Sequence, residues 1–150
     1  MRALTFWQPW ASLIALGHKT IETRTHEFRG LIGRRLAIHA GGTFHAEAAD
    51  LVRAAFAHAT PEQVAAFPIS YDQLEQHGRW PRACIVAVAT VADMRKLHSP
   101  ADDLAALSPA EGLYGIIFKD IVALDPPLGA KGKQGVWDWP LPDNLKHLET

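Results

Sequence analysis

The sequence predicts an α+β domain: a mixed β-barrel of about five to six strands with helices packed on its outside. Residues with strand propensity dominate both ends of the chain, whereas capping motifs and helical periodicity dominate the middle. No internal repeat or interdomain linker divides the 150 residues, a length that suits one domain with a sizeable core. We therefore expect a single domain over residues 1–150, with a helical insertion at about 43–78.

The first elements alternate between strand and helix. A short strand is expected over residues 3–6, and a helix over 9–16, where apolar residues fall at helical spacing. This helix opens with a proline, whose missing N–H is not needed in a first turn. Gly17 ends it, since glycine readily adopts the left-handed conformation of a C-cap. Two further strands are expected over residues 19–25 and 35–39.

Capping signals mark the helical middle. Thr43 is a plausible N-cap for a helix from residue 44 to about 58. Thr60 and Ser70 each begin a capping box, and Ser-Pro pairs indicate two more helical turns within residues 93–112. The remaining strands are expected over residues 83–92, 113–124 and 136–139.

Composition limits the class of protein. Hydrophobic residues make up 48% and charged residues 21%, which is ordinary for a globular domain. No apolar run approaches the ~20 residues that span a bilayer, so no membrane partner is expected. We find no signal-peptide pattern, and we interpret the single cysteine, Cys84, as a small buried hydrophobe. These features together predict a cytoplasmic protein.

Positive charge is concentrated near the N-terminus. The net charge of −1 argues against a broad electrostatic surface for nucleic acid. Residues 1–40 nevertheless hold six Lys or Arg against two acidic residues, and the remaining residues are acidic on balance. This asymmetry favours a local site for a phosphate or a short single strand over a long duplex track.

The most informative segment follows Gly17. In a strand, Glu22 and Arg24 lie on one face, and Lys19 stands at the strand entrance, where a turn can direct it toward them. A cation, a carboxylate and a guanidinium then converge beside an aromatic helix end. The alternative is an ordinary surface ion pair worth ~0–1 kcal/mol, with Trp7 and Trp10 in the core.

The motif Gly17-x-Lys19-x-x-Glu22-x-Arg24, preceded by Gln8-Pro9-Trp10-Ala11, resembles the signature of the ASCH family, which belongs to the PUA-like superfamily of small β-barrels. Further similar segments follow in the family's order, so that the resemblance covers about residues 3–140. They are Arg29-Gly30, Gly33 to Ala40, Pro81 to Ala87, Gly112 to Gly115 and Gly132 to Trp137. The resemblance implies a PUA-like barrel with a cleft at the motif.

The implied ligand is RNA, a nucleotide or a modified nucleoside. Lys19 is suited to donate to a carbonyl or phosphate, Glu22 to accept from an exocyclic amine or ribose hydroxyl, and Arg24 to stack on a base or hold phosphate. Trp7 is suited to stack on a base, whereas Trp10 lies on the apolar face of its helix and is expected in the core. The predicted ligand-binding residues are Trp7, Gln8, Lys19, Glu22, Arg24 and His39. For His39, a structural hydrogen-bonded role is the alternative.

Two other functions remain open. Some ASCH proteins are amidohydrolases of N4-acetylcytidine, with a threonine nucleophile where Glu22 stands here, a lysine matching Lys19 and a distant glutamate. In a hydrolase of this kind, or a ribonuclease, Lys19 and Glu22 are the predicted catalytic residues, Glu22 acting as general base and Lys19 holding the oxyanion. Glu111 either matches the distant acid or closes a capping box that begins at Ser108. The other alternative is a protein-interaction module of coactivator type.

The remaining motifs predict no cofactor. The eight histidines show no His-Glu-x-x-His spacing, and one cysteine cannot form a cluster, so no metal site is expected. Residues 129–135 carry three glycines and two lysines but lack the pattern of a phosphate-binding loop, and are expected to form a mobile turn. No particular protein partner is predicted.

Overall fold

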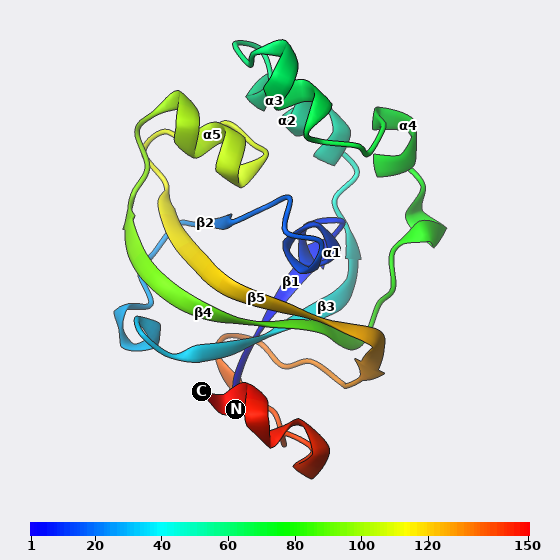
Figure 1. Cartoon of the computed structure of the whole chain (residues 1–150), viewed down its shortest axis with the longest axis vertical. Helices are drawn as coiled ribbons and strands as arrows, with labels where there is room; N and C mark the ends of the chain where they lie inside the picture. The colour runs from blue at the N-terminus through cyan, green and yellow to red at the C-terminus, as the bar shows by residue number, and fades with distance from the viewer.

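The computed structural model describes residues 1–150, and its frame is one curved six-stranded sheet of order β2-β5-β4-β3-β1-β6. Neighbouring strands are antiparallel except β1 and β3, which are parallel. The long strands β4 and β5 bend around the molecule (Figure 1). The strands are β1 (Arg2–Gln8), β2 (Ile21–Arg24), β3 (Arg35–Phe44), β4 (Cys84–Lys96), β5 (Tyr114–Gly129) and β6 (Trp137–Asp138).

The predicted α+β class and number of strands are confirmed, but the sheet does not close into a hydrogen-bonded barrel. β2 pairs only with β5, and β1 pairs with β6 only through Arg2 and Ala3. No backbone ladder therefore closes the gap between β1 and the segment that begins with β2. We call this gap, between residues 2–7 and residues 21–31, the seam.

Helix α1 (Trp10–Ala15) lies within the concave side of the sheet rather than outside it (Figure 1). It is apolar around most of its circumference, because Ala11 and Ile14 pack against the strands while Trp10 and Leu13 pack against other helices. Gly17 ends this segment with φ of +80°, as the sequence predicted. The helix thus forms the inner wall beside the seam.

The other helices lie at one end of the sheet (Figure 1). They are α2 (Ala48–Ala55), α3 (Pro61–Ala65), α4 (Tyr71–Leu74) and α5 (Pro100–Ala106). Outside this group the chain forms 3-10 turns, namely η1 (Arg29–Leu31), η2 (His77–Arg79) and η3 (Asp143–Glu149). Capping boxes form at Thr60, Ser70 and Ser99. The predicted helical turn at Ser108 does not form, because Leu107 takes a left-handed conformation and leads into a turn. No helix is long and apolar enough to cross a membrane.

Four strands are longer than predicted, namely β1, β3, β4 and β5. β3 continues to Phe44, so Thr43 is a strand residue and α2 begins only at Ala48. β5 runs through Pro126 and Pro127, beyond the expected end at residue 124. Both prolines lie where the hydrogen-bond ladder with β4 is irregular. Their missing N–H groups therefore do not interrupt a regular backbone pair.

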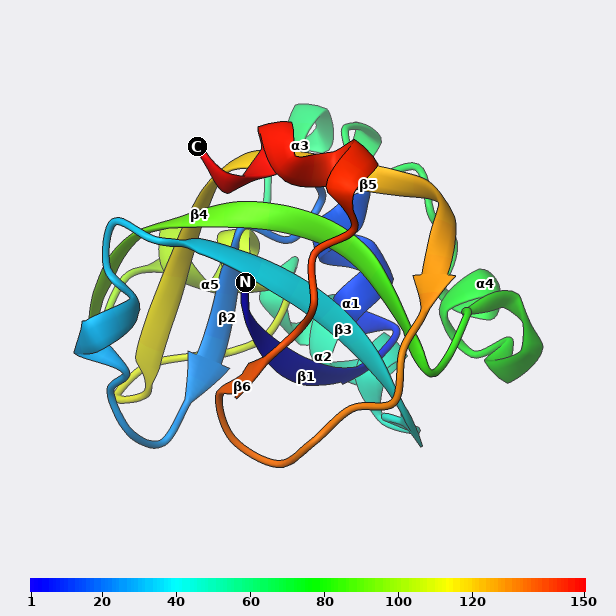
Figure 2. The ribbon, with the colours of Figure 1, turned by 90° about the horizontal axis from the view of Figure 1, so that it is seen from below.

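The convex face of the sheet has its own core. Trp137, Trp139 and Leu148 pack there against strand residues such as Ile85 and Val88. Figure 2 shows η3 crossing this side, and the two chain ends lie near each other there. The concave side, which holds α1, is therefore separated by the sheet from the face that the C-terminal segment covers.

Candidate functional site

A cavity of about 240 Å³ lies in the seam, where β1 and β2 diverge. Three consecutive residues from each strand line it, together with one residue of α1 and one that follows β3. The lining residues are Thr5, Phe6, Trp7, Trp10, Glu22, Thr23, Arg24 and His45. We call it the seam cavity.

Arg24 bridges the seam with its side chain. Its NH2 donates to the backbone oxygen of Thr5 at 3.2 Å and lies 3.9 Å from Oε2 of Glu22. The guanidinium also lies 5.2 Å from the centre of the Phe6 ring, within the range of a cation–π contact. Its Nε is buried without a hydrogen-bond partner. Contacts on both sides thus fix Arg24 at the wall of the cavity.

Glu22 stands between two cations. Its Oε1 accepts from the backbone N–H of Thr23 at 3.1 Å and lies 3.5 Å from Nζ of Lys19. Its Oε2 accepts no hydrogen bond within the protein, although the carboxylate borders the cavity. A carboxylate oxygen with free lone pairs is therefore available to a donor of a bound ligand.

Lys19 lies behind this wall and does not line the cavity. Its residue is only 1% exposed, and Nζ donates to the backbone oxygen of Ala106 in α5 at 2.5 Å. Nζ also lies 4.9 Å from the centre of the Trp10 ring. Burial lowers the pKa of the Lys19 ammonium below its ordinary value, and the neighbouring Glu22 partly opposes this shift. The expected direct contact of Lys19 with a ligand is thus not present in this conformation, because Glu22 and Trp10 stand in front.

Two indoles and an imidazole form the aromatic part of the cavity. Trp7 is 53% exposed, whereas Trp10 is buried as expected but still borders the cavity. Nε1 of Trp10 donates to Nδ1 of His45 at 2.9 Å. Because an indole N–H can only donate, Nδ1 of His45 is the acceptor, and its proton resides on Nε2. The His45 ring meets both indoles edge-on, at centroid distances of 5.6 and 5.7 Å.

His45 is one of the lining residues that sequence reasoning missed, together with Thr5, Phe6 and Thr23. The predicted helix from Phe44 placed His45 on a helical face, whereas β3 actually extends through Phe44 and delivers His45 to the seam. The residues from Ile38 to Phe44 are compatible with a strand and could have indicated that β3 extends this far. The two glycines within this segment instead suggested that the strand ends there.

Two predicted ligand-binding residues lie elsewhere. The buried Gln8 accepts from the N–H of Ser12 at 3.0 Å and donates to the Ser12 hydroxyl at 2.7 Å and to the oxygen of Pro81 at 2.6 Å. It thus caps the first turn of α1. The ring of His39 is buried and hydrogen-bonded to Thr5 Oγ1 at 3.1 Å and to the oxygen of Ala130 at 2.7 Å. Both side chains have their polar atoms satisfied within the protein, so neither faces the cavity.

Glu111 does not join the site either. It is exposed in the turn that precedes β5, and it does not line the seam cavity. The capping box expected from Ser108 is also not formed, since the Ser108 hydroxyl donates to the oxygen of Pro109 instead. The structure therefore supplies one carboxylate, Glu22, at the cavity wall. No group of three His, Cys, Asp or Glu side chains gathers in a way that could hold a metal ion.

Comparison with known proteins gives a likeness of fold. No protein-family model and no curated protein matches the sequence. The crystal structure of ASCH from Zymomonas mobilis aligns over 98% of this chain and 91% of its own, with a TM-score of 0.50 and 12% identity. A serine-to-alanine variant of that protein aligns over 85% of this chain and 72% of its own, with a TM-score of 0.46 and 12% identity. The chain thus shares the fold of an ASCH structure, in agreement with the motif at residues 17–24.

Proposed function

We propose that this ASCH-like domain binds RNA, or a nucleotide or modified nucleoside, with one base in the seam cavity. One observation carries the proposal: a solvent-exposed indole, a carboxylate with a free oxygen and a fixed guanidinium line the same cavity. Aromatic faces and paired polar groups are what proteins use to hold an unstacked base.

The size of the cavity suits a single base or nucleoside. Its volume of about 240 Å³ is below the ~300–1,000 Å³ typical of sites for drug-sized ligands. Trp7 offers a stacking surface worth ~1–3 kcal/mol in single-strand binders. A base stacked there in an unpaired strand or free nucleotide exposes its Watson–Crick edge to the opposite wall.

The polar wall presents an acceptor beside a donor. Oε2 of Glu22 is suited to accept from an exocyclic amine, and the guanidinium of Arg24 to donate to a neighbouring ring nitrogen or carbonyl. Lys19 supports this arrangement from behind, because its ammonium keeps the Glu22 carboxylate paired. In this proposal Lys19 is a positioning residue, and Glu22 and Arg24 contact the ligand.

The test is fluorescence anisotropy of a labelled single-stranded RNA with the wild-type protein and with Trp7→Ala and Glu22→Gln. We expect Trp7→Ala to weaken binding by about 5- to 150-fold, the equivalent of ~1–3 kcal/mol. Tyr71→Ala is the matched control, since Tyr71 is a partly exposed aromatic of α4 that does not line the cavity. Equal affinity of all three variants, or no binding of RNA or nucleosides by the wild type, would reject the proposal.

Hydrolysis in the same cavity is a second candidate, favoured by the Glu22 carboxylate, whose Oε2 accepts no hydrogen bond within the protein and which borders the cavity beside Arg24. In this candidate Glu22 takes a proton from a water molecule. Arg24 stabilises the developing oxyanion in place of Lys19, the residue predicted from the sequence, because Lys19 does not line the cavity. Turnover of an N4-acylated cytidine or of RNA, lost in Glu22→Gln while binding persists, is the expected result for an enzyme. Binding without turnover would support the binding function and reject hydrolysis of the substrates tested.

A further inference from the structure

Two larger cavities, of about 550 and 490 Å³, lie around the start of β1 and share Arg2 and Arg34, although neither has a lining residue in common with the seam cavity. The first lies beside residues 27–31, and the second lies next to it, beside the start of β3 and η3. They are lined by Arg2, Glu27, Phe28, Arg29, Gly30, Leu31, Arg34 and Val136, and by Met1, Arg2, Gly33, Arg34, Arg35, Thr90, Glu149 and Thr150. We call this part the lower seam.

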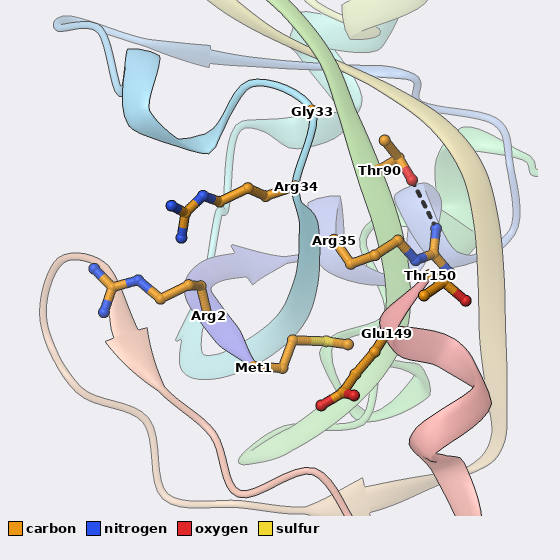
Figure 3. A pocket seen from close by; sticks show the side chains of 8 residues that line it. All are labelled: Met1, Arg2, Gly33, Arg34, Arg35, Thr90, Glu149 and Thr150. Atoms are coloured by element: carbon orange, nitrogen blue, oxygen red, sulfur yellow. Dashed lines mark hydrogen bonds between the residues drawn. The ribbon is translucent and has the colours of Figure 1, made fainter.

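Arg2 and Arg34 form the cationic wall of the lower seam. Figure 3 shows their guanidinium groups extending to the same side of the cavity from two neighbouring segments, whereas the Glu149 carboxylate lies apart from them. Arg34 is exposed and makes no ion pair. Arg2 pairs at 3.1 Å with Asp138, a carboxylate that itself remains largely exposed to solvent. Both guanidiniums can therefore accept an anionic partner without a buried pair being broken.

The acidic groups of this region are already paired with cations. Glu27 pairs with Arg29, and Glu149 lies 3.8 Å from Nζ of Lys146. Arg35 donates only to neutral oxygens, namely those of Leu148, Thr90 and Asp120, the last through its backbone carbonyl. The charges of Arg34 and Arg35 are thus not neutralised by carboxylates, and the lower seam is positive on balance.

Strand β1 sets the distance between the two parts of the seam. It runs from Arg2 to Gln8, and Trp7 of the seam cavity lies five residues after Arg2. At ~3.3 Å per residue, this separates their backbones by about 17 Å. A mononucleotide whose base stacks on Trp7 does not reach Arg2, whereas a strand of several nucleotides does.

We propose that Arg2 and Arg34 bind backbone phosphates of a single-stranded RNA, one base of which occupies the seam cavity. This inference rests on the proposed function and makes its ligand a short oligonucleotide of about four nucleotides, near the lower end of site sizes for small β domains. A single strand is favoured over a duplex, because the seam cavity requires an unstacked base. The phosphates follow the gap between β1 and residues 25–34, and the guanidiniums hold them with charge-assisted hydrogen bonds.

The test measures anisotropy competition for RNAs of one to six nucleotides, at several salt concentrations, with the wild type, Arg34→Ala and Arg2→Ala. Affinity is expected to rise with length up to about four nucleotides. Each variant is expected to lose several-fold affinity for the tetranucleotide and none for the mononucleotide. The slope of log K against log salt should fall by about 0.7 for each phosphate contact removed. Arg53→Ala is the control, since Arg53 is an exposed arginine of α2 that lies outside the seam.

The outcomes separate the two proposals. If the mononucleotide binds as tightly as the tetranucleotide and Arg34→Ala behaves like Arg53→Ala, the lower seam is not a phosphate site, although the seam cavity still binds its base. If tetranucleotide affinity depends on Arg2 and Arg34 but not on Trp7, the arginines bind phosphate without a base in the seam cavity, and the combined site is rejected. If no RNA or mononucleotide binds, both proposals fail.

Discussion

The two ends of the seam carry similar charges in opposite surroundings. At the upper end, Lys19 is enclosed, its ammonium is shared between Glu22 and a backbone oxygen, and burial lowers its pKa. At the lower end, Arg34 is exposed and makes no ion pair. A buried charge must be paired for the fold to persist, whereas an exposed one contributes little to stability and stays available to a ligand. Substitutions at the two ends of the seam should therefore differ in effect. A substitution at Lys19 should lower stability, whereas one at Arg34 should affect only the proposed binding of a ligand.

The largest expected effect is at Lys19. Lys19→Ala removes the nearer of the two cations beside the buried Glu22 carboxylate and leaves only Arg24, at 3.9 Å. This should lower the free energy of unfolding by about 3 kcal/mol, at the low end for a broken buried pair. Urea unfolding at neutral pH measures it. Lys146→Ala, which removes an exposed i,i+3 pair with Glu149, is the control and should stay within about 0.5 kcal/mol. If Lys19→Ala changes the free energy of unfolding as little as Lys146→Ala does, the ion pair of Lys19 does not support the fold.

Asp102 supports the same end through α5, the helix that supplies the Ala106 oxygen to Lys19. Arg95 binds its carboxylate through two hydrogen bonds, of 2.7 and 3.0 Å, and holds the pKa of Asp102 well below its ordinary value. Asp102→Asn should lower the free energy of unfolding at pH 7 by about 1–3 kcal/mol.

The lowered pKa of Asp102 also predicts how the effect of Asp102→Asn on stability changes with pH. A carboxyl with a depressed folded pKa stabilises the protein above its unfolded pKa of about 3.9, and this contribution is lost as pH falls below that value. The difference in unfolding free energy between wild type and Asp102→Asn should therefore shrink between pH 5 and pH 2.5. A difference that stays constant across this range would contradict the role of the ion pair.

Gly132 tests whether His39 is structural. A Cβ at Gly132 would lie 2.5 Å from Cε1 and 2.7 Å from Nδ1 of His39, a ring already fixed by two hydrogen bonds. Gly132→Ala should therefore destabilise the fold by about 1–3 kcal/mol through overpacking. Gly42→Ala, where a Cβ meets nothing within 4 Å, is the matched control. Thermal unfolding measures both, and RNA affinity below the midpoint should not change if His39 lies outside the binding surface.

The smallest expected effect on stability is at Arg34. Arg34→Ala removes an exposed side chain without an ion pair and should change the free energy of unfolding by less than about 0.5 kcal/mol. Urea unfolding of Arg34→Ala and Lys19→Ala under the same conditions compares the two changes in unfolding free energy. A loss above about 1 kcal/mol would mean that Arg34 supports the fold, and that both ends of the seam are structural.

The sequence was most informative where neighbours in the chain are neighbours in space. The convergence of Lys19, Glu22 and Arg24 follows from a glycine turn and the two-residue period of a strand, and both are local. The α+β class followed equally from propensities and capping boxes. The burial of Lys19 was not foreseen, because α5 covers it and that helix lies about 85 residues later in the chain.

Long-range topology explains what the sequence did not reveal. His45 and Trp7 meet only because β3 pairs in parallel with β1. Gln8 and His39 look like ligand groups in the chain, but their hydrogen-bond partners, Pro81 and Ala130, come from distant segments. The N-terminal excess of positive charge was visible, yet its division into a buried pair and an exposed cluster depended on tertiary packing, because α5 covers Lys19 while Arg34 stays exposed.

The width of the opening of the seam cavity depends on one side chain, because Arg24 forms the bridge to Thr5. In a closed barrel, a ladder of backbone hydrogen bonds would set the distance between these strands, and no substitution could alter it. Here a single guanidinium reaches across, held by one carbonyl and the face of Phe6. Replacing Arg24 with a shorter or longer side chain thus offers a way to narrow or widen the opening while the strand order stays the same. In the proposed site, the size of the ligand then becomes tunable at one position, without redesign of the sheet.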